Sequence, residues 1–243
     1  MTERSSGLPE RFDDIKKSYG EILENIARAA EKTGRKPEDV ILLAATKTVD
    51  PVYINYAVSL GLKYIGENKV QELLSKYEDY DLKNCELQFI GHLQTNKVRQ
   101  IVGKVSMIQS VDSLKLAREI SRQSVKNQVN TDILIEVNIG REENKSGVFE
   151  ENLEELIAEI SAFENIKVRG LMTVPPICDK KSDVCKFFDR MYKLFIDISG
   201  KTLDNVSMDL LSMGMSDDYT EAILSGANMV RVGSRLFGAR IYR

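Results

Sequence analysis

The first part of the chain places apolar residues at the spacing of a helix. Between Arg11 and Lys32 an apolar side chain recurs every three or four residues, which is the period of an amphipathic helix. Gly34 and Pro37 follow this stretch, and both residue types favour the end of a helix. The apolar positions are Phe12, Ile15, Tyr19, Ile22, Leu23 and Ile26. The pattern predicts an amphipathic helix ahead of the first strand.

Beyond Pro37 the pattern changes to short apolar or β-branched runs, separated by segments long enough for a helix. The runs are Ile41 to Lys47, Tyr64 to Asn68, Leu87 to Leu93, Met107 to Val111, Asp132 to Asn138, Val168 to Val174, Met208 to Gly214 and Met229 to Gly233. Helical spacing returns between them, as from Leu153 to Phe163 and from Val184 to Ile198. Such alternation is typical of a parallel sheet covered by helices. Eight units predict an α/β fold, a closed (β/α)8 TIM barrel, with an open doubly wound sheet as the alternative.

The length of the chain agrees with one barrel. It has 243 residues, within the size range of a single α/β barrel with a substantial core. No Gly/Ser-rich or Pro-rich tract divides it. We therefore expect one domain over residues 1–243, acting as a monomer.

Composition narrows the functional classes. The sequence has no apolar run of about eighteen residues or more and no charged-then-apolar leader, which predicts a soluble, cytoplasmic protein with no membrane partner. A net charge of -3, a pI near 5.5 and scattered lysines argue against nucleic acid as a partner. Cys85, Cys178 and Cys185 lack C-x-x-C spacing and nearby histidines, so free thiols are expected and no metal site.

Ligands of such barrels bind at the carboxyl ends of the strands, and there the first strand ends in Lys47. Strand alternation places Lys47 on the face of Ile41, Leu43 and Ala45, so its side chain can enter the barrel mouth. Desolvation there disfavours the ammonium form and frees the amine to attack an aldehyde, which suits a Schiff base. The alternative is a strand-end lysine that extends to solvent or pairs with a carboxylate.

The last two strands end in small residues that suit a phosphate. The segments Leu211 to Ser216 and Val230 to Ser234 end in backbone N–H groups and hydroxyls, in the two loops where barrel enzymes frequently hold phosphate. Ser216 to Asp218 can also cap a following helix from Tyr219 to Leu224. The alternative is that these residues only form tight turns and caps.

Arg231 shares a face with Met229 and Gly233 and is expected to enter the barrel near the first strand. A buried guanidinium needs a partner, which could be a bound anion, a heteroaromatic acceptor, or a carboxylate. The candidate carboxylates near strand ends are Glu67, Glu136 and Asp209.

Two further polar residues lie near strand ends. Asn68 can bond a ring hydroxyl or cap the helix that begins near Lys69. His92 is the only histidine, and no neighbouring residue in the sequence assigns it a chemical role.

Taken together, these segments resemble the YggS/PROSC family of pyridoxal phosphate homeostasis proteins, whose barrel is similar to the cofactor-binding domain of alanine racemase. The resemblance runs nearly end to end. Its motifs stand at Ala45 to Thr48, Gly66 to Glu72, Phe89 to Lys97, Gly170 to Pro176 and Leu211 to Asp218, continuing through Ala222-Ile223 and Gly226 to Val230 to Ser234 and Phe237-Gly238.

The resemblance implies a set of roles for pyridoxal 5'-phosphate (PLP) as cofactor. It implies that Lys47 forms the internal aldimine, that Asn68 lies beside the ring and that Arg231 faces the pyridine nitrogen. It further implies that the phosphate is held by Ser212, Met213, Gly233 and Ser234. Ser234 stands where a threonine is common in the family, and Asn228 likewise replaces a frequent threonine. Only the serine keeps the hydroxyl.

The resemblance also implies a carrier more than a catalyst. A cation opposite the pyridine nitrogen disfavours its protonation and weakens the ring as an electron sink. Alanine racemase also has an arginine there but needs a catalytic tyrosine from a second domain, whereas this sequence ends at Arg243 just after the last strand, so we expect that partner to be absent. The expected function is reversible storage and delivery of PLP in vitamin B6 homeostasis, with free amino acids and apo PLP-dependent enzymes as further partners.

Two alternatives stay open. One is a fold-type III PLP enzyme, a racemase or lyase. The other is a scaffold protein for which the cofactor is only structural, although no exposed apolar stripe in the sequence supports it.

Overall fold

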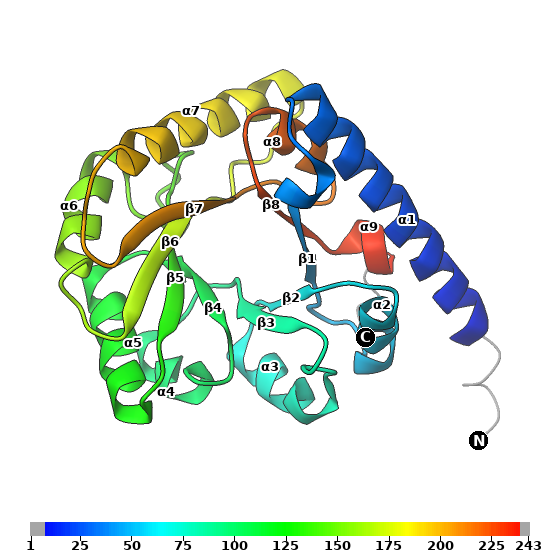
Figure 1. Cartoon of the computed structure of the whole chain (residues 1–243), viewed down its shortest axis with the longest axis horizontal. Helices are drawn as coiled ribbons and strands as arrows, with labels where there is room; N and C mark the ends of the chain where they lie inside the picture. Colours follow the sequence, from blue (N-terminus) through cyan, green and yellow to red (C-terminus); the bar gives the residue numbers. More distant parts are fainter. Residues whose placement is uncertain (1–7, 239–243) are drawn as a thin grey trace.

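The computed structural model describes residues 8–238. Eight parallel strands form a closed barrel in sequence order, with the last strand hydrogen-bonded to the first (Figure 1). The strands are β1 (Ile41–Ala45), β2 (Tyr64–Glu67), β3 (Glu86–Phe89), β4 (Met107–Val111), β5 (Thr131–Glu136), β6 (Ile166–Met172), β7 (Val206–Ser212) and β8 (Met229–Val232). The predicted barrel is confirmed, and the open doubly wound sheet was the wrong alternative.

Helices surround the ring of strands (Figure 1). They are α1 (Leu8–Lys32), α2 (Pro51–Ser59), α3 (Val70–Lys76), α4 (Val98–Ile101), α5 (Leu114–Asn127), α6 (Glu150–Ile160), α7 (Lys181–Ser199), α8 (Tyr219–Leu224) and α9 (Ser234–Phe237), with 3-10 turns at Pro37–Asp39, Tyr77–Asp79 and Thr95–Lys97. Among residues 8–238, no helix combines the length and the apolar character needed to cross a membrane.

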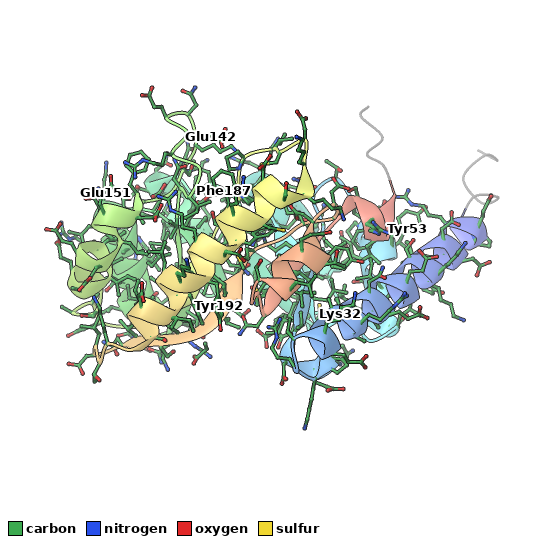
Figure 2. All side chains as sticks on the ribbon, turned by 90° about the horizontal axis from the view of Figure 1, so that it is seen from above. Lys32, Tyr53, Glu142, Glu151, Phe187 and Tyr192 are labelled. Atoms are coloured by element: carbon green, nitrogen blue, oxygen red, sulfur yellow. The ribbon has the colours of Figure 1, made fainter. Side chains whose placement is uncertain are left out.

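The N-terminal helix α1 is amphipathic as predicted, and it packs against α8 and α9 outside the barrel. Its apolar face is buried, with Ile22 fully inaccessible to solvent. Gly34 ends the helix with a φ of +73°, a backbone conformation that glycine adopts without strain. The following Arg35 donates to the carbonyl of Ala227 at 2.8 Å and to that of Ile223, so it satisfies the open end of α8. Figure 2 shows α7 and α1 on either side of α8.

The core has two layers, which define the inward side of each strand. A large layer fills the space between strands and helices. Inside the barrel are two small clusters, with Leu210 packed against both. Their buried members are Leu43, Ile90 and Met229 in one, and Met107, Leu134 and Met172 in the other. On each strand, the next inward-facing residue lies two positions closer to the carboxyl end. These residues therefore line the mouth of the barrel.

Candidate functional site

The turn that carries Lys47 lies beside the turn that follows β8. Strand β1 pairs with β8 so that Leu43 lies opposite Arg231. Just beyond, Gly233 approaches Ala45 so closely that a Cβ on the glycine would lie 3.1 Å from the Ala45 carbonyl oxygen. Lys47 is half-buried two residues after Ala45, which packs with the inner cluster. The structure thus brings the turn that carries Lys47 and the predicted phosphate turn to the same edge of the barrel.

Arg231 enters the barrel and is buried, with 4% of its surface accessible. Its Nη1 donates to the Ser212 hydroxyl at 2.7 Å and its Nη2 to the Thr173 carbonyl at 2.8 Å. No carboxylate of residues 8–238 forms an ion pair with it. Burial lowers the pKa of Arg231 to about 10, although the negative charges of Glu136 and Asp218 act to raise it. The side chain is therefore still a cation at neutral pH.

Two of the carboxylates considered as partners of Arg231 are therefore corrected. Glu67 lies on the outer side of β2, where its Oε1 pairs with Lys76 at 3.1 Å. Asp209 pairs with Arg169 at 2.7 Å. Only Glu136 stays within electrostatic reach, without a direct ion pair.

The Ser212 hydroxyl lies inside the barrel and is engaged on both sides. It accepts from Arg231 and donates to the Gln109 Oε1 at 2.7 Å. Gln109 in turn donates to the Gln88 Oε1 at 2.6 Å. This buried chain of neutral groups holds the guanidinium in place. The Ser212 hydroxyl already bonds Arg231 and Gln109. A contact between Ser212 and a phosphate therefore stays a prediction.

The other predicted phosphate residues differ in what they can offer. The Met213 side chain is buried in the outer core, and its amide donates to the Met229 carbonyl at 3.1 Å, so its contribution stays a prediction. Ser234 is exposed, and its amide, at the first position of α9, has no hydrogen bond within the described part of the chain. The Gly233 amide donates to the Ser216 hydroxyl at 3.2 Å, as does that of Arg235 at 3.3 Å.

Residues Ser216 to Asp218 do not cap α8 through their side chains, which corrects that expectation. Asp218 stands at the cap position, but its Oδ1 accepts from the Met215 amide at 2.6 Å. Ser216 instead joins the turn after β7 to the turn after β8. Burial raises the pKa of Asp218, although this bond from Met215 opposes the shift.

Asn68 carries an unsatisfied polar atom at the barrel mouth. Its Oδ1 is buried and has no hydrogen-bond partner among residues 8–238. The cap position of α3 belongs to Lys69, so the capping role considered for Asn68 is wrong. Gly91 packs directly against the backbone of Asn68, because a Cβ on the glycine would lie only 2.1 Å from the Asn68 carbonyl oxygen. A buried oxygen without a partner in the protein is typical of a site that a ligand completes.

Acidic and imidazole groups line the other side of the mouth. Burial raises the pKa of Glu136 to about 7, assisted by the charge of Asp112 and opposed by Arg231. The His92 Nδ1 lies 2.9 Å from the Ser146 hydroxyl and 4.0 Å from Asp112. Neither partner of His92 could be predicted from the sequence, because Ser146 and Asp112 lie on other segments of the chain.

The inner glutamines were also missed from the sequence. Gln88 and Gln109 are both almost fully buried in β3 and β4. Polar amides in the middle of otherwise apolar strands were the available signal, since buried amides require partners. The arrangement as a whole can receive a small anionic heteroaromatic molecule: a guanidinium held by neutral groups, an unsatisfied amide and exposed turn donors surround the end of β1.

Comparisons with known proteins agree with this chemistry. Residues 18–241 match the model of the alanine racemase N-terminal domain family. The chain is 46% identical to the pyridoxal phosphate homeostasis protein of Aquifex aeolicus over 221 residues, 91% of this chain and 96% of the other. It is 33% identical to the protein of the same name from Escherichia coli K12, with 95% and 99% covered. A solved structure of PipY from Synechococcus elongatus PCC7942 with PLP bound superposes with a TM-score of 0.77 at 28% identity, covering 88% of this chain and 100% of PipY.

Proposed function

Because the chain belongs to the family of pyridoxal phosphate homeostasis proteins, built on the alanine racemase N-terminal domain, we propose that it binds PLP at the barrel mouth and releases it to other proteins. The observation that carries the proposal is the meeting of the Lys47 turn with the Gly233-Ser234 turn at the end of β1. The whole chain acts as one PLP-binding unit in this proposal.

When bound, PLP supplies an aldehyde that condenses reversibly with a primary amine, with loss of water. Lys47 is the residue whose Nζ provides that amine. Lys47 is half-buried just after the end of β1. Reversibility makes the residue suited to both loading and release.

Four other residues suit the rest of the cofactor. Asn68 presents its unsatisfied Oδ1 to a ring substituent. Arg231 would hold the pyridine nitrogen with its guanidinium, and Ser234 would hold the phosphate with its amide and hydroxyl. Gly233 allows the close approach of the turn to β1.

The character of Arg231 supports a carrier more than an enzyme. A guanidinium with a pKa of about 10 keeps its proton at neutral pH and does not give it to the ring nitrogen, and its positive charge would disfavour a proton there. A carboxylate in that place would favour the protonated ring that stabilises carbanions. The proposed site therefore binds the cofactor with restrained carbanion chemistry.

One observation favours the second candidate, a fold-type III racemase or lyase. Glu136 has a pKa raised to about 7, so it can exchange a proton near neutral pH in the same mouth. Steady turnover of an amino-acid panel by the PLP-loaded protein, or rapid exchange of an α-proton for deuterium, would identify an enzyme. A Glu136→Gln variant that loses such exchange would assign the proton transfer.

The proposed partners are PLP, free amino acids and apo PLP-dependent enzymes in the cytoplasm. Delivery is tested by mixing loaded protein with an apo enzyme and following the recovery of its activity. A control with free PLP at the same concentration separates direct transfer from release into solution. A protein that restores no activity, yet stabilises the apo enzyme, would be a scaffold.

Attachment to Lys47 is tested by borohydride. We expect a visible absorbance band in the loaded protein, fixation of the cofactor by borohydride, and mapping of the modification to Lys47. Lys47→Ala should abolish the band and the fixed adduct. Lys69→Ala is the matched control, because Lys69 is exposed beside Asn68 and makes no capping bond, and it should retain both. An adduct that persists in Lys47→Ala would refute the proposal.

A further inference from the structure

A cluster of three charged side chains lies against the turn that carries Lys47, on the outer side of the barrel. Glu67 comes from the end of β2, and Glu72 and Lys76 come from α3. Lys76 is 2.6 Å from the Glu72 Oε1 and 3.1 Å from the Glu67 Oε1. The Glu67 side chain is fully buried, and those of Lys76 and Glu72 are 13% and 19% exposed.

Lys76 uses its third hydrogen bond on the backbone beside Lys47. An ammonium group has three N–H donors, and two of them reach the carboxylates. The third donates to the Thr46 carbonyl oxygen at 3.1 Å. That carbonyl belongs to the peptide group that precedes Lys47.

Glu72 holds the peptide group on the other side. Its Oε1, which pairs with Lys76, also accepts the backbone N–H of Thr48. The peptide groups before and after Lys47 are therefore bonded to two members of one ion pair. We call Glu72 and Lys76 the turn clamp.

The conformation of Thr48 explains why such a clamp is needed. Thr48 has a φ of +64°, in the left-handed region that a β-branched residue rarely adopts. A strained residue keeps this conformation only when neighbouring contacts enforce it. The bond from the Thr48 amide to Glu72 is one such contact, and it acts at the strained residue itself.

Glu67 fixes the clamp to the barrel wall. Its Oε1 accepts from the Thr46 hydroxyl at 2.9 Å and the Tyr80 hydroxyl at 2.7 Å, in addition to Lys76. Burial and the charge of Glu67 raise the pKa of Tyr80, which keeps its hydroxyl a donor at all ordinary pH values. The clamp is thus anchored through buried bonds and does not depend on a flexible surface pair.

We propose that the Glu72–Lys76 ion pair is a positioning device for Lys47, holding the turn in the strained conformation that directs the amine toward the bound aldehyde. This inference rests on the proposed attachment of PLP to Lys47. Glu72 and Lys76 do not touch the cofactor in this account; they act through the two peptide groups. An ion pair that only fastened α3 to the barrel would not need to bond both sides of one residue.

The test compares three variants with a matched control. Glu72→Ala removes the acceptor of the Thr48 amide, Lys76→Met removes the donor to Thr46, and Glu72→Gln keeps an oxygen that can accept from Thr48. The control is Arg122→Met, which breaks a helical ion pair with Glu119 at 2.7 Å on α5, outside α3 and the turn clamp. Rates of adduct formation are followed by stopped-flow absorbance, and amide hydrogen exchange of Thr48 is measured in the cofactor-free protein.

We expect Glu72→Ala and Lys76→Met to slow adduct formation by about 10-fold or more, because small misplacements of a reacting group cost this much or more. Thr48 should lose exchange protection in Glu72→Ala and regain most of it in Glu72→Gln, together with the adduct rate. Arg122→Met should match wild type in both measurements.

Different failures have different meanings. If the wild-type adduct maps to Lys47 and Glu72→Ala forms it at the wild-type rate, the clamp is wrong and the proposed function stands. If the wild-type adduct maps elsewhere, both proposals fall. If Lys76→Met does not fold, Glu72→Ala still decides, because its side chain is partly exposed on the surface of α3.

Discussion

Arg169 and Arg231 lie on two strands of the barrel, β6 and β8, and have opposite kinds of partner. Arg169, on β6, bonds the carboxylates of Asp132 at 2.5 Å and Asp209 at 2.7 Å. Its side chain is 31% exposed. Arg231, on β8, is buried and bonds only a hydroxyl and a backbone carbonyl among the described residues. One guanidinium is neutralised by the protein, and the other is not.

The difference separates a structural charge from a charge kept for a ligand. Burying an arginine without a carboxylate costs free energy, and a neutral hydrogen-bond shell recovers only part of it. Arg231 is buried without a paired carboxylate near the carboxyl ends of the strands, where barrel proteins bind their ligands. Arg169 lies further from those ends and has its full complement of counter-charge. Ligand binding should therefore depend on Arg231 and not on Arg169.

The largest expected effect is the loss of PLP affinity when Arg231 is replaced. Arg231→Gln removes the positive charge and should weaken PLP binding by about 10- to 100-fold, since a hydrogen bond to a charged group contributes about 1.5–3 kcal/mol. The measurement is an absorbance titration of the cofactor-free variant with PLP. Arg169→Gln is the control and should bind PLP as wild type does. Equal losses of affinity in both variants would contradict the comparison.

The fold was predictable because strand and helix periods are local properties of the sequence. All eight predicted runs contain a strand, yet several strands end earlier than predicted. The run Leu87 to Leu93 contains a strand only to Phe89, because Gly91 must approach the backbone of Asn68. That approach joins segments more than twenty residues apart, and no local pattern records it.

The site was predictable as a set of strand ends but not as a set of bonds. Lys47, Asn68 and Arg231 lie at or just after the carboxyl ends of β1, β2 and β8, and their roles toward a cofactor stay predictions. Glu67 was considered as a partner of Arg231, but it faces outward and pairs with Lys76. Buried parallel strands are apolar on both sides, so the sequence does not show which side is inward. For the same reason the hydrogen bonds from Gln109 and Ser212 could not be predicted.

A smaller effect should appear at Glu136, which tests whether Arg231 has a counter-ion. Burial raises the pKa of Glu136 to about 7 from an ordinary value of 4.5, despite the nearby Arg231. A raised pKa stabilises the folded state fully below about pH 4.5, and this contribution is lost as the pH rises through about 7. Removing the carboxylate charge should therefore favour the folded state only at the higher pH.

The measurement is urea unfolding of cofactor-free wild type and Glu136→Gln at pH 5 and pH 8. We compare the free energy of unfolding of the variant with that of wild type at each pH. The gain of the variant over wild type should be about 1–2 kcal/mol larger at pH 8 than at pH 5. This is less than the full pKa shift corresponds to, because the side chain is not completely buried. A difference independent of pH would mean that Glu136 is ionised throughout and acts as the counter-ion of Arg231. The contrast with Arg169 would then be weaker.

The smallest effect concerns Arg169 itself. Burial raises the pKa of Asp209, but hydrogen bonds from Ser207 and Arg169 outweigh it and lower the value. A lowered pKa contributes stability above the ordinary value of 3.8 that is lost as the pH falls. A double-mutant cycle of Arg169→Gln and Asp209→Asn should give a coupling of about 0.5–1 kcal/mol at pH 7, the usual worth of a partly exposed ion pair.

Thermal or urea unfolding of the four proteins measures this coupling, and the coupling should decrease as the pH is lowered below 3.8 and Asp209 takes up its proton. High salt should also reduce it, because the pair is open to solvent. If instead the coupling is large and unaffected by salt, Arg169 is held as tightly as a buried charge. The carboxylates of Asp132 and Asp209 would then stabilise the fold as strongly as a buried ion pair does. The two arginines would differ in their partners, but the stability of the fold would depend on both to a similar degree.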